Sequence, residues 1–367
     1  MLQNETLLES QNESGTIRPL IISDIKTVRQ YCSSFRHLLF GFEAQGMISA
    51  IVVPPASDIE SFLFPGVGVV EHPALIFPIY FIQNRKLLIS RIEKIRPDII
   101  HCYSTSKVLL AKSLAEHFGI PAVITINSGR IGFSVKMIIN KSFERIIVPS
   151  NRIADQLEQR GLPREKISQV NIGTFADESC ACFAKPERLP SMIVLGPFDK
   201  FSDYEPLLGA IRHLSVDGYE FAVIFMGQGR AEGRIRDFIK STGLVQTVSI
   251  TPMIRPLRAV FRGCDIFIHS CRSGEFAPAV IEAAGAGLAI AADKNNVEDF
   301  LQDGSTAVLF DGSDELSIYS SLGKLLDDRA LAKTTASAAQ DYLRSNNSIS
   351  SMINNLLKIY SEAKVIR

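Results

Sequence analysis

The chain has 367 residues, of which 46% are hydrophobic and 21% charged, the composition of a folded globular protein. This length predicts two domains of roughly 150 to 200 residues each. Lys and Arg total 39, and Asp and Glu also total 39, so the chain has no net charge at pH 7. That balance argues against a nucleic-acid-binding protein, whose sites usually carry an excess of basic residues.

The first 16 residues are polar and acidic, the opposite of the basic and then apolar order of a signal peptide. We expect a disordered lead-in here. The rest of the chain has no run of ~18 apolar residues that could span a membrane, which predicts a soluble, cytoplasmic protein. The six cysteines are scattered, which predicts free thiols in a reducing compartment. Cys180 and Cys182 have no partners at metal-ligand spacing, so no metal site is expected.

The first half alternates apolar runs with helical patterns, which predicts a doubly wound parallel sheet. The predicted strands are 20–24, 48–55, 99–101, 122–127, 145–150 and 166–173. The predicted helices are 28–45, 79–95, 106–118 and 151–161. Prolines, cysteines and charges without periodicity then predict a linker over 178–190.

The second half repeats the same alternation and predicts a second α/β domain of Rossmann type. Its predicted strands are 191–196, 221–227, 247–252, 266–268, 288–292 and 306–310. Its predicted helices are 204–217, 231–242, 257–263 and 279–284, with further helices to the end and a last one over 348–363.

The stretch 265–287 is the most informative part of the chain. It predicts a strand, a loop, a helix and the start of a further strand. A loop at the carboxyl end of a strand, followed by the first N–H groups of a helix, is where α/β proteins bind phosphorylated ligands. Two carboxylates, Glu275 and Glu282, flank that place.

The segment Gly274–Gly287 resembles the signature of the GT-B fold glycosyltransferases of family 4. That signature has a loop reading Glu-Gly-Phe-Gly, a second Glu and then Ala-Met-Ala-x-Gly. Further similarities are spread over nearly the whole chain, at 97–101, 149–151, 171–173 and 303–310. The family consists of retaining enzymes that transfer a sugar from a nucleotide-sugar donor.

The resemblance implies two Rossmann-like doubly wound parallel-sheet domains that face each other across a cleft. The N-terminal domain, 17–177, would lie on the acceptor side, and the C-terminal domain, 191–345, would bind the nucleotide-sugar. The last segment, 346–367, would form a helix that packs back on the N-terminal domain.

The resemblance also implies roles for the two carboxylates. Glu282 would bind the ribose hydroxyls of the donor, because a carboxylate accepts two hydrogen bonds from a vicinal diol. The alternative is a structural Glu on a helix surface. Gly274 stands where the family has its first Glu, and Glu275 stands where the family has Gly. Either Glu275 reaches the site through a changed loop, or the site is altered.

The family usually meets the donor diphosphate with an Arg and a Lys after the first strand of this domain. Here Pro197 follows Gly196, and Lys200 lies close to the expected Lys position. Lys200 is therefore a candidate phosphate ligand, with a solvated loop lysine as the alternative. Arg230, which follows Gly227-x-Gly229, is a second candidate. The glycine spacing there differs from a dinucleotide-binding fingerprint.

Backbone groups complete the expected donor site. The N–H groups of Phe276 and Ala277, with the dipole of the helix that follows, would donate to phosphate. In the N-terminal half, Asn127 could donate to a sugar hydroxyl. His101, at a strand end, is a catalytic candidate, with a structural or capping role as the alternative.

The sequence thus predicts a retaining glycosyltransferase with a glycan, lipid-linked or small-molecule acceptor and with no metal or other cofactor. A catalytically degenerate homologue and another two-domain Rossmann enzyme, such as a sugar-nucleotide epimerase, are the alternatives. The basic helix 79–95, preceded by Phe77, could lie on an anionic membrane and place the protein at its inner face. An ordinary amphipathic helix with a solvated basic face is the alternative.

Overall fold

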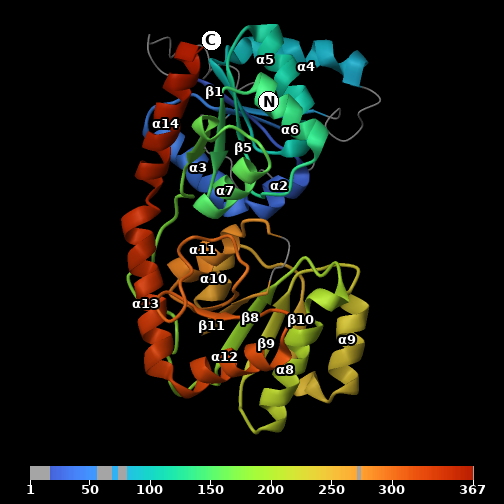
Figure 1. Cartoon of the computed structure of the whole chain (residues 1–367), viewed down its shortest axis with the longest axis vertical. Helices are drawn as coiled ribbons and strands as arrows, with labels where there is room; N and C mark the ends of the chain where they lie inside the picture. The colour runs from blue at the N-terminus through green and yellow to red at the C-terminus, as the bar shows by residue number, and fades with distance from the viewer. Residues whose placement is uncertain (1–16, 56–67, 73–80, 271–273, 367) are drawn as a thin grey trace. The chain divides into compact units, whose positions relative to one another are not determined.

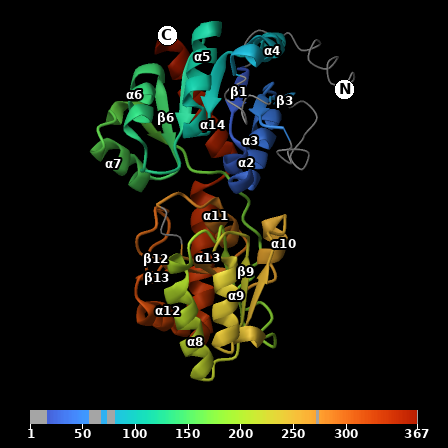
Figure 2. The ribbon, with the colours of Figure 1, turned by 90° about the vertical axis from the view of Figure 1, so that its right-hand side faces the viewer.

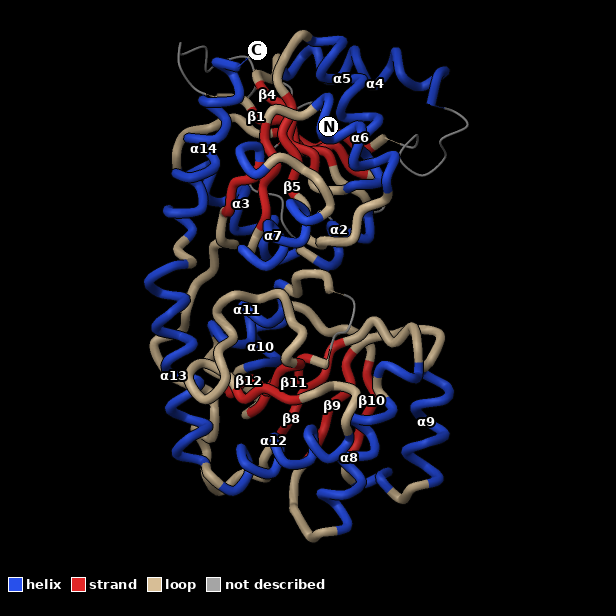
Figure 3. Tube along the Cα trace, viewed as in Figure 1, coloured by secondary structure: helices blue, strands red, loops and turns tan. Residues whose placement is uncertain are grey.

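The computed structural model describes residues 17–55, 68–72, 81–270 and 274–366, so the predicted lead-in lies outside the described residues. The chain forms two compact units. Unit 1 runs to Gly173 and resumes at Ile349, and unit 2 runs from Thr174 to Ser348. Each unit contains one sheet with helices around it (Figure 3).

Unit 1 contains a parallel sheet in the order β3-β2-β1-β4-β5-β6-β7. The strands are β1 (Pro19–Ile22), β2 (Ala50–Val53), β3 (Gly68–Glu71), β4 (Ile99–Cys102), β5 (Ala122–Thr125), β6 (Arg145–Val148) and β7 (Ile167–Gln169). The order reverses between β1 and β4. The carboxyl ends of these two strands therefore mark the place where such sheets bind ligands.

The helices of unit 1 cover both faces of its sheet (Figure 1). They are α2 (Ile25–Gln30), α3 (Cys32–Ala44), α4 (Phe81–Ile95), α5 (Val108–Phe118), α6 (Phe133–Ser142), α7 (Asn151–Gln159) and α14 (Ile349–Ile366). The last of them, α14, packs against α3 over one core. The approach is close, because a Cβ added at Gly41 of α3 would lie 2.4 Å from Ile353 Cγ1.

Unit 2 contains a parallel sheet in the order β10-β9-β8-β11-β12-β13. The strands are β8 (Ser191–Leu195), β9 (Ala222–Met226), β10 (Val248–Thr251), β11 (Ile266–His269), β12 (Ala289–Asp293) and β13 (Val308–Phe310). The helices are α8 (Glu205–Val216), α9 (Glu232–Ser241), α10 (Leu257–Phe261), α11 (Pro278–Gly285), α12 (Glu315–Asp327) and α13 (Arg329–Asn346).

The helices of unit 2 form two layers. On one side α8 packs against α12, and on the other α11 packs against α10 and α13. Figure 2 shows α8 and α9 in front of the sheet, with α11 and α13 behind it. The order reverses between β8 and β11, so the ligand edge of this unit lies at the loops that follow these strands.

Two doubly wound parallel sheets confirm the predicted fold class. Three details differ from the predictions. The helix predicted over 28–45 is two helices, because the chain leaves the helical conformation at Tyr31. A regular helix, α6, lies between the predicted strands 122–127 and 145–150, a stretch that the sequence left as irregular or helical, and β3 was not predicted.

The predicted linker, 178–190, is an integral part of unit 2. The N–H of Cys182 donates to the carbonyl of Gly287 at 2.8 Å. The buried carboxylate of Asp265 accepts from the N–H of Phe183 at 2.9 Å and from Arg188 at 3.0 Å. The segment lacks periodicity because it is an irregular piece of packed backbone, which a composition-based prediction cannot distinguish from a linker.

Candidate functional site

The loops that follow β8 and β9 form one rigid platform at the carboxyl edge of unit 2. The N–H of Phe198 donates to the Gln228 carbonyl at 3.1 Å, and the N–H of Ala231 donates to the Phe198 carbonyl at 2.8 Å. A Cβ at Gly229 would lie 2.1 Å from the Phe198 oxygen. The glycines at 227 and 229 therefore allow two loops to pack together, which agrees with a structural role rather than a dinucleotide fingerprint.

A pocket of about 390 Å³ lies between these loops. We call it the basic pocket, and its lining residues are Asp199, Lys200, Phe201, Ser202, Glu205, Arg230, Ala231 and Arg234. It brings together Lys200 and Arg230, two of the predicted phosphate ligands. Gly196 lies at the base of the same platform, where its N–H donates to the Met226 carbonyl at 2.9 Å.

Arg234 of α9 is a member of this pocket that the sequence analysis missed. Its guanidinium lies over the Phe201 ring, 4.5 Å from the ring centroid. The contact is a cation–π interaction that limits the movement of the long side chain. Its sequence signal was weak: Arg234 lies in the first turn of α9, four residues after Arg230 of the preceding loop.

The start of α11 is bound to a buried carboxylate. Glu298 has no exposed surface, and its Oε1 accepts from the N–H of Ala277 at 2.7 Å. Its Oε2 accepts from the N–H of Val297 at 3.1 Å and lies 3.5 Å from His269 Nε2. A negative charge is favourable at a helix N-terminus. The N–H of Ala277, predicted to bind phosphate, is therefore already used within the protein.

The segment before α11 contains three of the predicted site residues. The Phe276 side chain is buried, and Glu275 is half-buried. Gly274 has φ of 64°, in the left-handed region that favours glycine. A glutamate at this position would be strained in this backbone conformation.

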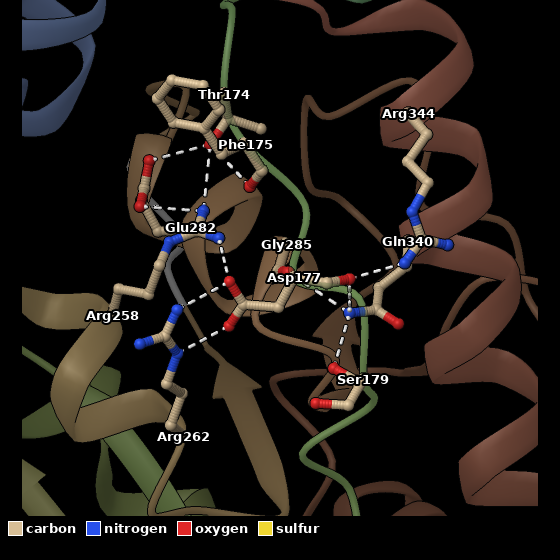
Figure 4. Close-up of polar contacts among 10 residues, drawn as sticks. All are labelled: Thr174, Phe175, Asp177, Ser179, Arg258, Arg262, Glu282, Gly285, Gln340 and Arg344. Carbon is tan, nitrogen blue, oxygen red and sulfur yellow. Dashed lines mark hydrogen bonds and ion pairs between the residues drawn. The ribbon is translucent and has the colours of Figure 1, made fainter.

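Glu282 of α11 is buried, and both of its oxygens bind protein groups (Figure 4). Thr174 Oγ1 donates to Oε1 at 3.1 Å, and Arg258 Nη2 donates to Oε2 at 3.3 Å. We call Glu282, Arg258, Thr174, Asp177 and Arg262 the Glu282 cluster. The alternative considered from sequence, a structural Glu on a helix surface, is wrong about exposure, because Glu282 is buried. Its contacts with Thr174 and Arg258 agree with a structural role as well as with a binding role.

Asp177 is the second carboxylate of the Glu282 cluster. Arg262 binds it with two nitrogens, at 2.7 and 2.9 Å, and Arg258 Nη1 binds it at 3.1 Å. The hydrogen bond from Arg262, with the charge of Arg258, lowers the pKa of Asp177 against the opposing effect of burial. The cluster therefore pairs two guanidinium groups with two carboxylates, and no cation of this set lacks a counter-charge.

His101 lies at the end of β4 in unit 1, in a sealed polar network. It is fully buried, and Nδ1 lies 2.6 Å from Tyr360 Oη while Nε2 lies 2.7 Å from Thr125 Oγ1. Burial lowers its pKa to about 3, so the ring is neutral at pH 7. With both nitrogens bound inside the fold, this geometry supports the structural role and leaves no nitrogen for a substrate.

Asn127 lines a small pocket of about 40 Å³ at the carboxyl edge of the unit 1 sheet. Most of the other lining side chains are apolar, among them Phe35, Ile147 and Leu356, and Tyr103 and Thr125 add hydroxyl groups. Asn127 follows Thr125 by two residues in the chain. Of these two side chains, that of Thr125 is the one that binds His101. Of the two predicted residues of unit 1, Asn127 lines the pocket and His101 is bound within the fold.

Asp24 is a polar residue at the strand reversal of unit 1 that the sequence analysis missed. Its Oδ2 accepts from the hydroxyls of Ser104 and of Ser106, the latter at 2.6 Å, and its Oδ1 accepts from the N–H of Thr27 at 2.8 Å. Burial opposes ionisation, but these hydrogen bonds outweigh it and lower the pKa of Asp24. The sequence signal was a Ser-Asp pair directly after a buried strand.

Comparison with known families identifies the chain. Residues 178–342 match the family model described as Glycosyl transferases group 1, and residues 34–174 match the model described as Glycosyltransferase Family 4. The chain is a GT-B glycosyltransferase of family 4. No sequence among the curated proteins matches this glycosyltransferase.

Solved structures share the fold of this glycosyltransferase over nearly its whole length. Sucrose-phosphate synthase from Thermosynechococcus elongatus is 15% identical, with a TM-score of 0.80 over 96% of this chain and 100% of that one. Anabaena HepE in complex with UDP and glucose is 12% identical, with a TM-score of 0.77 over 94% and 100%. A glycosyltransferase from Rickettsia africae is 16% identical, with a TM-score of 0.76 over 95% and 99%. At these identities the likeness shows the fold.

Two further features of this glycosyltransferase bear on its predicted partners. Within the part of the chain that the structure describes, no helix combines the length and the apolar character needed to cross a bilayer. Of the predicted membrane-facing segment, Phe77 lies outside the described residues. In α4, Leu88 and Ile92 are buried against the unit, so these side chains belong to its core.

Proposed function

We propose that this chain is a retaining glycosyltransferase that moves a sugar from a nucleotide-sugar donor to an acceptor hydroxyl. The observation that carries the proposal is the basic pocket, which gathers Lys200, Arg230 and Arg234 at the carboxyl edge of the unit that matches the group 1 model. A related fold has been solved with UDP and glucose, which supports a nucleotide-sugar as the donor.

The donor diphosphate carries about two negative charges, and the basic pocket offers cations from two adjacent loops. Lys200 comes from the loop after β8, and Arg230 and Arg234 come from the loop and helix after β9. Arginine suits this task because its planar fork can bind two phosphate oxygens. In this proposal the three cations replace the missing Arg and Lys of the family, and Glu282 accepts from the ribose hydroxyls.

The proposed reaction breaks the bond between the anomeric carbon and the diphosphate oxygen and forms one to the acceptor oxygen. Both events take place on the same face of the sugar, so the anomeric configuration is kept. The acceptor proton passes to the oxygen of the leaving diphosphate. Since negative charge grows on that group, side-chain cations stabilise the transition state, each charged hydrogen bond contributing ~1.5 to 3 kcal/mol, or one to two decades in rate.

We assign the acceptor to unit 1, where Asn127 and the hydroxyl of Tyr103 border the small apolar pocket. A glycan, a lipid-linked sugar and a small molecule all fit this assignment. For a lipid-linked acceptor, exposed basic residues of α4 such as Lys86 and Lys94 would face the anionic inner surface of a cytoplasmic membrane.

A catalytically degenerate homologue is the second candidate, and two observations favour it. Gly274 replaces the first Glu of the signature in a backbone conformation that suits glycine. The N–H of Ala277 donates to Glu298 instead of remaining available to a phosphate. Such a protein would bind a sugar nucleotide without transferring the sugar.

Calorimetric titration with UDP, GDP and their sugars tests the proposal. Wild-type protein should bind one nucleotide class saturably, and the double variant Lys200→Ala/Arg230→Ala should bind it at least about tenfold more weakly. Arg236→Ala is the matched control, because this arginine lies on α9, pairs with Glu232 at 2.8 Å and does not line the pocket.

The outcomes separate the two candidate functions. Nucleotide binding together with release of the free nucleotide from a nucleotide-sugar, in the presence of an acceptor, supports the transferase. Nucleotide binding without turnover over a broad acceptor panel supports the degenerate homologue. No binding to any nucleotide at millimolar concentration contradicts both.

A further inference from the structure

Arg258 connects the two carboxylates of the Glu282 cluster (Figure 4). Nη1 donates to Asp177 at 3.1 Å, and Nη2 donates to Glu282 at 3.3 Å and to Thr174 Oγ1 at 3.2 Å. These three partners lie on two segments: Asp177 and Thr174 on the chain entering unit 2, and Glu282 on α11. A single guanidinium therefore fixes the place of Glu282 relative to that entering segment.

The geometry around Glu282 leaves its carboxylate little freedom. Thr174 Oγ1 accepts from Arg258 and donates to Glu282 Oε1, so the three side chains form a closed ring of hydrogen bonds. The side chain of Glu282 is only 7% exposed. Burial of a carboxylate is costly unless a nearby cation and hydrogen bonds compensate for the lost contact with water. Arg258 provides the cation and Thr174 the second donor.

Arg258 lies close to the end of α11. A Cβ added at Gly285, at the end of α11, would lie 2.9 Å from Arg258 Nη2 and 2.8 Å from the Phe175 carbonyl. The helix that bears Glu282 thus ends in a glycine that makes room for the guanidinium. Arg258 itself is only 17% exposed, although it lies on the five-residue helix α10.

We propose that Arg258 is a positioning residue for nucleotide binding: it holds the Glu282 carboxylate in the orientation that the ribose hydroxyls of the donor require. The inference rests on the proposed function, in which Glu282 binds the ribose. Arg258 acts through Glu282 and touches neither the sugar nor the reacting bond. Its guanidinium cannot be replaced fully by a lysine, because an ammonium is a point charge that does not span both carboxylates.

Arg262 offers a matched comparison within the same cluster. It binds Asp177 through two nitrogens, at 2.7 and 2.9 Å, closer than the 3.1 Å of Arg258, but it has no contact with Glu282 among the described hydrogen bonds. Its side chain is 61% exposed. Loss of Arg262 therefore removes a charge and an Asp177 partner and leaves the contact between Arg258 and Glu282 in place.

The test measures nucleotide affinity by calorimetry for Arg258→Met, Arg262→Met, Glu282→Gln and the double variant Arg258→Met/Glu282→Gln, using the nucleotide that wild-type protein binds. We expect Arg258→Met to weaken binding about tenfold and Arg262→Met less than about twofold. In the Glu282→Gln background, Arg258→Met should have little further effect, because both changes disrupt the same contact.

Two results would overturn the inference while the proposed function stands. One is an equal loss for Arg258→Met and Arg262→Met, which would mean that only the Asp177 pair matters. The other is a full additional loss from Arg258→Met in the Glu282→Gln background, which would mean that Arg258 acts independently of Glu282. Wild-type protein that binds no nucleotide would refute the proposed function, and the inference with it.

Conservative variants keep the test decisive if Arg258→Met does not fold. Arg258→Lys should fold and bind with an intermediate affinity. Thr174→Val removes the hydroxyl that donates to Glu282 Oε1 and should weaken binding several-fold, whereas Thr174→Ser should restore it. Equal affinities for the Val and Ser variants, with Arg258→Lys like wild type, would show that the orientation of Glu282 does not depend on this ring.

Discussion

Buried His101 should make unit 1 sensitive to mild acid. In the folded protein its pKa is about 3, lowered by burial from an ordinary value of 6.5. Between these two values the unfolded chain binds a proton that the folded chain does not, so stability falls as pH decreases below 6.5. The loss approaches about 1.4 kcal/mol per pH unit and reaches about 2 kcal/mol at pH 5 relative to pH 8.

The neighbours of His101 do not change this sign. Tyr360 contacts Nδ1 and Tyr103 stacks on the ring with centroids 4.1 Å apart, and burial raises the pKa of both phenols, so both are neutral throughout this range. Thr125, at Nε2, does not titrate. The pKa of Asp24 is lowered from its ordinary value of 3.8, so this carboxylate stays ionised between pH 5 and pH 8.

The assay compares wild type with His101→Gln, which retains a hydrogen-bonding side chain and does not titrate. Native-state hydrogen exchange in urea, followed on peptides of β4 and α14, reports the opening free energy of unit 1 at pH 5 to 8. We expect His101→Gln to lower the opening free energy of unit 1 at pH 8. Between pH 8 and pH 5, however, this free energy should fall by about 2 kcal/mol less in His101→Gln than in wild type. The other five histidines contribute equally to both proteins. Parallel slopes would refute the assignment of a neutral, buried His101.

Three further predictions follow from the site. Gly229→Ala places a Cβ 2.1 Å from the Phe198 oxygen, so it should lower the melting temperature and abolish nucleotide binding. Glu298→Gln removes the charge at the start of α11 and places an NH2 group, itself a donor, against the N–H of Ala277 or of Val297. Denaturant titration should therefore show a free energy of unfolding lower by about 1 to 3 kcal/mol. Asp24→Asn weakens a helix cap and should cost about 1 kcal/mol at pH 7. Because the pKa of Asp24 is lowered, that difference should shrink below pH 3.8.

The sequence could predict the strands and the ligand edge because both depend on local patterns. Short apolar runs, 192–195 and 266–268, mark β8 and β11, and the break after β11 marks the loop at the carboxyl edge of the sheet. The sequence could also predict Lys200 and Arg230 as separate candidates. It could not show that both line one pocket with Arg234, since that depends on the backbone contacts between two loops far apart in the chain.

Other parts of the site could not be predicted because they depend on long-range partners. His101 at a strand end has the same sequence context whether it faces a ligand or the core, and only α14, more than 240 residues later, decides between them by supplying Tyr360. Arg258 has no motif and lies on a short helix, yet it binds Glu282. The burial of His101 and the contacts of Arg258 follow from packing between distant segments, which local patterns do not encode.

The small residues of the signature have a physical explanation in the segment that was expected to be a linker. The N–H of Asp177 donates to the Gly285 carbonyl at 2.8 Å, and a Cβ at Gly287 would lie 2.7 Å from Cys180 Cα. Because Gly285 and Gly287 have no side chains, the chain entering unit 2 can pass close to the helix that carries Glu282. That same chain supplies Thr174 and Asp177 to the Glu282 cluster. The entering segment and α11 are therefore joined through Arg258, which binds Thr174, Asp177 and Glu282 together.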